Sequence, residues 1–171
     1  GWFSHVDMKD RVDLIIRKSS EHYIRVTAGS HLIDGIITEL SNGTLYIRNE
    51  NSCNWVRSFK NKYTVEIGVD SLQSIATYGN GSITCPDTLS VYEFTFDSWN
   101  ASGSIDLLLS CQTSHLNNNT GRIDMRVAGK AGVSYIAFND VAYPDASKLV
   151  TDLTYMRNNS TGDLKVCAQH E

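Results

Sequence analysis

A short phrase recurs at a nearly constant spacing between residues 78 and 168. In each copy an asparagine is followed by a small residue or glycine, and then by an apolar residue that begins a strand-like stretch. The copies begin at Asn80, Asn100, Asn119, Asn139 and Asn159, so the successive intervals are 20, 19, 20 and 20 residues, and the copy at Asn139 lacks the glycine. A fixed period of this length indicates a repeat architecture, in which each unit buries its apolar face against its neighbours.

Within each unit, apolar and polar residues alternate after the glycine. Residues 105–109 and 123–127 each place three apolar side chains on one face and mostly polar ones on the other, although Leu108 interrupts the first stretch. Such a period of two predicts β-strands with one buried face. Glycine and asparagine tolerate positive φ angles, which suits the corners between these strands. We therefore expect one interior row of stacked residues, formed by Ile83, Ile105, Ile123 and Leu164.

Three repeat folds can be compared with this pattern. Leucine-rich repeats have a similar period, but they need a regular leucine pattern and a helical return segment, and the sequence shows neither. A β-propeller blade needs about 40 residues, which is roughly two of these units. A parallel β-helix needs only short strands, turns and an apolar interior that at least three stacked coils bury together. The sequence therefore favours an all-β solenoid, a parallel β-helix with coils about 20 residues long.

The glycine steps and the stretches before them resemble one known family. The stretches that carry the resemblance are 79–83 (Gly-Asn-Gly-Ser-Ile), 102–106, and 161–164 in the repeat, and 36–39, 43–47, 63–67 and 72–75 upstream. In order and spacing they are similar to the autotransporter-adhesin head family, or head GIN domain, of Bacteroides-type envelope proteins. The resemblance spans about residues 10–168 and implies a right-handed β-helix, an adhesive role and no catalytic residues. It also implies export to the periplasm, the outer-membrane surface or the extracellular space.

The two parts of the chain are expected to play different roles in this fold. Residues 1–77 are predicted to form N-terminal strands and a hairpin or cap, and residues 78–168 the repeat ladder, which should be irregular at 141–147, where the pattern fails. Residues 2–8 are predicted to be a loose lead-in. An Asn-Gly step at Asn42 predicts a β-hairpin. Since no linker rich in proline or glycine separates the parts, we expect a single domain over residues 1–171.

Composition excludes several classes of protein. Charged residues make up 20% and hydrophobic residues 41% of the chain, which is typical of a globular domain. A net charge of -4 argues against a nucleic-acid partner, because domains that bind nucleic acids are normally basic. No apolar run approaches the roughly 18 residues that a membrane-spanning helix needs. No signal peptide or lipid anchor is predicted within this sequence, and no oligomeric state can be derived from it.

The sequence contains four cysteines, Cys53, Cys85, Cys111 and Cys167. Four cysteines allow three pairings, and their spacing does not choose among them. None has a CxxC spacing, so we predict no zinc site. Cys85 and Cys111 share the parity of inward-facing neighbours, and we expect both to behave as small buried apolar residues.

No constellation of catalytic or metal-binding residues is recognisable, and no cofactor is predicted. Asp106 and Asp124 follow the same ladder position in successive units. Stacked carboxylates in a β-helix are compatible with a calcium site or with the acid pair of a glycosidase. Arg122 and Arg126 flank the pair, however, so we favour a solvated outer face with neither metal nor catalysis.

A binding patch is predicted in the irregular stretch that precedes the ladder. It gathers aromatic and basic residues, namely Trp55, Arg57, Phe59, Lys60, Lys62 and Tyr63. Exposed aromatic and arginine side chains are typical anchors of binding sites, although for Trp55 and Phe59 we favour the alternative that they cover an open end of the core. We therefore predict a non-enzymatic envelope domain that binds a glycan or a surface protein. The alternatives are a polysaccharide-degrading, pectinase-like β-helix enzyme and a structural spacer.

Overall fold

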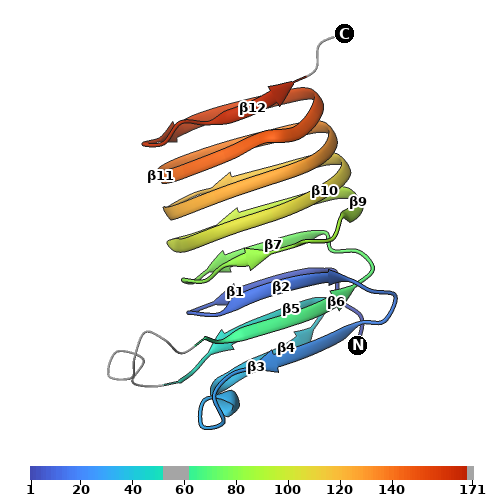
Figure 1. The fold of residues 1–171 in the computed structure, drawn as a ribbon, viewed down its shortest axis with the longest axis vertical. Coiled ribbons are helices and arrows are strands. Elements are labelled where there is room, and N and C mark those ends of the chain that lie inside the picture. Colours follow the sequence, from blue (N-terminus) through green and yellow to red (C-terminus); the bar gives the residue numbers. More distant parts are fainter. Residues whose placement is uncertain (52–61, 169–171) are drawn as a thin grey trace.

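The computed structural model describes residues 1–51 and 62–168, which form an all-β protein (Figure 1). Twelve strands belong to one sheet that curves back on itself and is nearly closed. Within the described residues, the strands are interrupted by a single turn of 3-10 helix, η1 (Ile33–Gly35). The strands are β1 (His5–Lys9), β2 (Asp13–Lys18), β3 (Tyr23–Thr27), β4 (Ile36–Ser41), β5 (Thr44–Asn49), β6 (Thr64–Val69), β7 (Ser74–Tyr78), β8 (Ile83–Thr84), β9 (Leu89–Ser98), β10 (Ala101–Asn118), β11 (Gly121–Ser160) and β12 (Lys165–Ala168).

The strands stack along the long axis of the molecule in two walls (Figure 1). The first wall contains β3, β6, β2 and β8 in that order, and the second wall contains β9, β7, β1, β5 and β4. Strand β10 belongs to both walls, because Ile105 and Asp106 pair with β8 whereas the residues from Leu109 to Asn118 pair with β9. We call one passage of the chain across both walls a rung.

The rungs of the C-terminal part pair in parallel at a constant offset. Strand β10 pairs with β11 from Ala101 opposite Gly121 to Asn118 opposite Phe138, and the partners throughout are 20 residues apart, as Ser114 and Ser134 are. Strand β9 pairs with β10 at the same offset. The offset matches the period of the recurring asparagines, because each repeat supplies one rung and residues one period apart become neighbours in the sheet.

The last rung is less regular. Asp145 of β11 lies opposite Lys165 of β12, and the register then shifts between Ala146 and Val150. The shift overlaps the end of residues 141–147, the stretch in which the repeat pattern fails. Leu164, which was expected in the interior row, is only partly buried, although it packs against the core.

The interior row expected from the sequence is also out of register at Ile123. Ile83 lies opposite Ile105, and both are buried. Ile105 lies opposite Met125, however, and Ile123 lies opposite Gly103. The separation of Ile105 and Ile123 falls short of the ladder offset by two positions, so they occupy neighbouring rows. Because side chains alternate with a period of two, such a slip keeps both isoleucines inside, and the sequence pattern does not reveal it.

Strands β1 and β2 form a rung in the middle of the stack. His5 of β1 lies opposite Thr44 of β5 on one side and Ser74 of β7 on the other, and β2 lies between β6 and β8 in the same way. Val6 is 1% exposed. The loose lead-in expected at residues 2–8 is therefore wrong. Its alternation is too short to be recognised, and its partner strands lie far away in the sequence.

The N-terminal end of the stack is closed by antiparallel strands. Strand β3 pairs antiparallel with β6, and β4 pairs antiparallel with β5. The turn of the β4–β5 hairpin contains Asn42 and Gly43 with φ angles of 49° and 74°, so the predicted hairpin is confirmed. These antiparallel strands occupy the outermost positions of the sheet at this end.

Glycine recurs because the rungs approach each other closely at one corner. Gly103 has a φ of +151°, and a Cβ atom there would lie 2.0 Å from the carbonyl oxygen of Gly81 on the adjacent rung. At Gly121 a Cβ atom would lie 2.1 Å from the carbonyl oxygen of Ala101. Only glycine avoids these overlaps, so the repeat needs glycine at the positions where neighbouring rungs come into close contact.

In the last rungs of the ladder, asparagine side-chain amides bridge neighbouring rungs. The Asn159 amide donates to Oδ1 of Asn139 at 3.2 Å, and the Asn139 amide donates to the carbonyl oxygen of Asn118 at 3.1 Å. Asn118 is fully buried, and its Oδ1 accepts a hydrogen bond from Ser98 Oγ at 2.6 Å. Buried polar groups need such partners. The buried member of this ladder is therefore Asn118, and not the adjacent Asn119 from which the period was counted.

Candidate functional site

The binding patch predicted from the sequence lies only partly within the described residues. Four of its six members fall in the stretch 52–61, outside these residues: Trp55, Arg57, Phe59 and Lys60. Lys62 is exposed at the end of this segment, whereas Tyr63 is 4% exposed and belongs to the hydrophobic core. The structure therefore places Lys62 at the surface and assigns the Tyr63 ring a mainly packing role.

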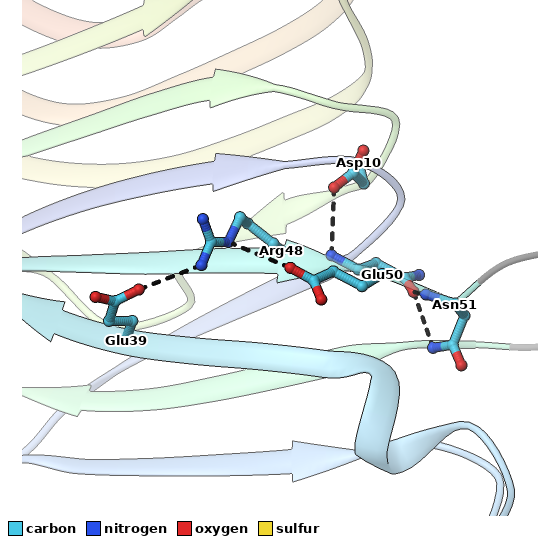
Figure 2. Close-up of polar contacts among 6 residues, drawn as sticks. Asp10, Glu39, Arg48, Glu50 and Asn51 are labelled. Carbon is cyan, nitrogen blue, oxygen red and sulfur yellow. Dashed lines mark hydrogen bonds and ion pairs between the residues drawn. The ribbon is translucent and has the colours of Figure 1, made fainter.

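Figure 2 shows the strand end that precedes the segment. The backbone N–H of Asn49 donates to Oδ2 of Asp10 at 3.3 Å, and the Asn51 amide donates to Oδ1 of Asn49 at 2.9 Å. On the same strand, Arg48 pairs with Glu39 across the hairpin at 3.2 Å. The turn after β1 and the β4–β5 hairpin thus fix the residues that precede the segment.

A groove of about 420 Å³ lies beside the other end of the segment, and we call it the corner groove. It is lined by Arg11, Asp13, Lys62, Tyr63, Asn80, Gly81, Ser82, Ser102, Gly103 and Ser104. Asp13 Oδ1 accepts hydrogen bonds from both the backbone N–H and the hydroxyl of Ser82, each at 2.8 Å. The lining offers hydroxyls, an amide and charges of both signs, which suits a polar ligand. The glycines that let the rungs approach also keep this corner free of bulky side chains.

The two aspartates considered for calcium or catalysis are not ladder neighbours. Asp106 lies opposite Arg126 and Asp124 lies opposite Ser104. Arg126 Nη1 lies 3.2 Å from Asp106 Oδ1, so the register forms an ion pair rather than a carboxylate pair. Among the described residues, no group of three or more His, Cys, Asp or Glu side chains is arranged to hold a metal ion. The expected common ladder position is wrong by the same slip of two positions that separates Ile105 from Ile123.

The outer face of the second wall carries a pocket that the sequence pattern did not reveal. Its volume is about 340 Å³. We call it the second-wall pocket, and it is lined by His5, Gln73, Ser74, Tyr92, Glu93 and Thr95. These residues come from β1, β7, β9 and the residue before β7. The pairing of β7 with β9 brings five of them together, and the pairing of β1 with β7 adds His5 from far away in the chain.

A row of aromatic rings continues from this pocket toward the C-terminal end of the stack. Thr95 lies opposite His115, and His115 lies opposite Tyr135. The rings of His115 and Tyr135 stack with centroids 4.9 Å apart, and those of Tyr135 and Tyr155 with centroids 5.0 Å apart. Tyr135 and Tyr155 remain 40% and 52% exposed. Because the rings lie one period apart, this aromatic row could have been found by searching the outward positions at the period of the repeat.

His5 and Ser74 are hydrogen-bonded within the pocket, and their arrangement can be compared with that of a nucleophile and its base. His5 Nδ1 and Ser74 Oγ lie 2.8 Å apart. A hydrolase also needs N–H donors aimed at the developing oxyanion. The backbone N–H of Ser74 donates instead to the carbonyl oxygen of Ser4 at 3.3 Å, as part of the ladder. The pair is therefore better suited to fixing the imidazole than to nucleophilic catalysis.

The cysteines of the described residues are free thiols. Cys85 is buried and Cys111 packs partly against the core, as expected. Burial raises the pKa of each of these two thiols to about 11. Thiolate is scarce at neutral pH with such a pKa, so neither side chain is a suitable nucleophile. Cys53 lies outside the described residues.

A family model described as "Putative auto-transporter adhesin, head GIN domain" matches residues 2–171. The chain belongs to this family. The resemblance found in the glycine steps and hairpins is thereby confirmed. Membership fits a non-enzymatic domain of a cell-surface or envelope protein. None of the curated proteins matches the sequence.

Solved structures share the fold of this head GIN domain. A "putative adhesin" from Bacteroides fragilis superposes with a TM-score of 0.84 at 18% identity, covering 96% of this chain and 75% of that one. A "putative lipid binding protein" from Parabacteroides distasonis has a TM-score of 0.69 at 17% identity, with coverages of 90% and 73%. A "putative adhesin" from Parabacteroides merdae has a TM-score of 0.63 at 14% identity, with coverages of 90% and 72%. At these identities the likeness concerns the fold alone.

In residues 1–51 and 62–168, no helix has the length and apolar character that a membrane span requires.

Proposed function

We propose that this head GIN domain is an exported, non-enzymatic binding module that mediates adhesion to a glycan or to another surface protein. The observation that carries the proposal is the match of the adhesin-head family to nearly the entire chain. The periplasm, the outer-membrane surface and the extracellular space are all compatible with this role.

The proposal includes a right-handed parallel β-helix as the scaffold. Support comes from parallel pairing at the constant offset of one repeat and from strands that cross both walls of the stack. In such a scaffold each rung is fixed by its neighbours, and side chains at the corners and on the walls form regular rows. A rigid arrangement of this kind lowers the entropy that a binding surface loses when a partner arrives.

The corner groove, together with the segment that carries Trp55 and Arg57, is the proposed adhesive surface. Hydrogen bonds at Asn49 and Asn51 hold one end of the segment, and the Asp13 backbone N–H donates to the carbonyl oxygen of Tyr63 at 2.7 Å at the other. Binding groups concentrate on loops that a rigid scaffold positions. Aromatic area combined with arginine and lysine donors suits a glycan or an acidic chain of a surface protein.

The Trp55→Ala variant tests this surface, with Trp99→Ala as a matched control because Trp99 is 47% exposed. Affinity would be measured for ligands found on a glycan array or among surface proteins, and thermal unfolding would be measured in parallel. Loss of affinity with an unchanged melting temperature supports the adhesive role of Trp55. If Trp55 instead covers the core, its truncation costs about 3–5 kcal/mol of stability and leaves affinity intact. That result would remove the tryptophan from the binding surface.

The rival function is polysaccharide cleavage on the same scaffold. It predicts turnover in a polysaccharide degradation screen, and loss of that turnover when Asp106 and Asp124 are both replaced by Asn. Ester hydrolysis abolished by Ser74→Ala would likewise overturn the non-enzymatic proposal. A structural spacer predicts neither turnover nor binding.

A further inference from the structure

We propose that the second-wall pocket binds an uncharged carbohydrate, independently of the corner groove. The pocket is lined by His5, Gln73, Ser74, Tyr92, Glu93 and Thr95, all within the described residues. Its volume of about 340 Å³ lies at the lower end of the range for small-molecule sites, which run from about 300 to 1,000 Å³. A single sugar unit is the ligand size that such a pocket accommodates.

The lining has the chemistry that sugar hydroxyls require. An imidazole, an amide, a carboxylate and two aliphatic hydroxyls line one space, and together they provide both donors and acceptors. Sugar hydroxyls act in both ways, so each of these groups has a counterpart on the ligand. Tyr92 adds the apolar component, because it is 79% exposed and borders the pocket. An aromatic ring that is open to solvent beside polar groups can pack against the C–H face of a sugar.

The pocket is held in shape before any ligand arrives. His5 and Ser74 are partners in the ladder, and so are Ser74 and Thr95. The backbone N–H of Thr95 donates to the carbonyl oxygen of Gln73 at 2.9 Å, and that of Gln73 donates to the carbonyl oxygen of Ser4 at 2.7 Å. The contact of 2.8 Å between His5 Nδ1 and Ser74 Oγ fixes the imidazole. A site on paired strands loses little entropy on binding.

The charges of the lining residues favour an uncharged ligand. Glu93 is the one carboxylate among the six described residues that line the pocket, and none of the six is Lys or Arg. The Glu93 carboxylate lies 3.3 Å from His115 Nε2, which orients it at the edge of the aromatic row. A uronate or sialic acid would meet this carboxylate without a compensating lysine or arginine. The corner groove differs in this respect, because Arg11 and Lys62 line it.

The aromatic row extends the pocket into a linear site. From Thr95 the row continues through His115, Tyr135 and Tyr155, one side chain per rung, and rungs follow one another about 4.8 Å apart. Since these rings stack on one another, they present edges and phenol hydroxyls, rather than open faces, to a ligand. A chain of sugars that begins in the pocket therefore finds hydrogen-bonding partners along the wall, and an oligosaccharide should bind more tightly than its monosaccharide.

The test is titration calorimetry of the chain with cello-, xylo-, manno- and chitohexaose, their monosaccharides, and a hexagalacturonate as the charged comparator. At least one neutral hexaose is expected to bind more tightly than both its monosaccharide and the hexagalacturonate. Tyr92→Ala removes the aromatic contact and Glu93→Gln replaces a charged acceptor by a neutral amide, so each should weaken that binding by about tenfold or more. Tyr143→Ala is the matched control, because Tyr143 is 46% exposed and lies outside the pocket.

Three outcomes overturn the proposal. The first is that no neutral hexaose binds the folded wild-type chain at millimolar concentration. The second is that both pocket variants, with unchanged circular dichroism, bind as the wild type does. The third is that Trp55→Ala abolishes hexaose binding while Tyr92→Ala does not, which would place the carbohydrate at the corner surface. In that last case the adhesive function of the corner surface stands and the second-wall pocket fails, so the two proposals are tested separately.

Discussion

Strands β9 to β11 of the head GIN domain take their partners from the next repeat, whereas β1 takes its partners from much later in the chain. Strand β10 meets β11 at an offset of 20 residues, but His5 meets Ser74, which lies 69 residues away. The two regions nevertheless form one sheet with the same parallel geometry. A repeat in the sequence therefore identifies the part of the ladder that is built locally, and it gives no indication of rungs inserted from a distance.

The largest difference between the inserted strand β1 and the terminal strand β12 is expected when each is removed in turn. Deleting residues 1–9 removes a strand that is paired on both sides and leaves the edges of β5 and β7 without a partner. We expect this variant to lose cooperative thermal unfolding altogether. Truncation after residue 164 removes β12, which pairs only with β11 among the described strands, and it should leave a cooperative transition. Circular dichroism melting curves and amide NMR spectra provide the measurement. Equal melting temperatures would show that the inserted rung is not the structural centre.

The second largest effect is expected from the core of the ladder. Ile105 is 1% exposed, and Ile105→Ala should lower the free energy of unfolding by about 2–5 kcal/mol, measured by urea denaturation. Leu164 is only partly buried at the end of the ladder, so Leu164→Ala should cost less than about 2 kcal/mol. If the two losses were equal, the end of the ladder would be packed as tightly as its middle, and the difference between the regions would shrink.

Glycine substitutions separate the close corner of the ladder from the hairpin of the N-terminal part. Gly103→Ala should cost at least about 2 kcal/mol, because strain at this φ is joined by overlap with the carbonyl oxygen of Gly81. Gly43 also has a positive φ, +74°, but nothing lies within 4 Å of the position a Cβ would take. Gly43→Ala should therefore cost only about 1 kcal/mol. Similar losses in urea denaturation would show that the rungs separate easily at the corner.

The sequence was informative wherever the structure repeats its own pattern. The period, the β4–β5 hairpin and the inward positions of Ile83 and Ile105 could be predicted, because each depends on neighbours one period or one turn away. The sequence placed Asp124 opposite Asp106, two positions away from its observed partner, Ser104. The error could not be seen in the alternation, because a slip of two residues leaves every side chain on its correct face. The central place of β1 was missed because so short a strand carries too little alternation to indicate a partner so far away.

The candidate sites show the same difference between residues that are close in the sequence and residues that are far apart. The patch around Trp55 was predicted from residues that are adjacent in the chain, and most of it lies outside the described residues. The second-wall pocket escaped prediction because its lining comes from three separate stretches of the chain between His5 and Thr95. Such a pocket becomes visible only when the strand order is known. The aromatic row that extends the pocket, by contrast, repeats at the period of the asparagines, so it could have been predicted from the sequence.

The smallest expected effect concerns the register of the ladder itself. Arg126 Nη1 lies 3.2 Å from Asp106 Oδ1, and both side chains are substantially exposed, so the pair should contribute at most about 1 kcal/mol. A double-mutant cycle of Asp106→Asn and Arg126→Gln should give a coupling energy of a few tenths of a kcal/mol that decreases as salt is added. Asp124 is opposite Ser104 instead, so the cycle of Asp124→Asn with Arg126→Gln serves as the control and should show weaker coupling. A coupling between Asp106 and Arg126 no larger than that of the control would contradict the observed register, because a shift of two positions would place Asp124 opposite Asp106 and return Ile105 and Ile123 to one row.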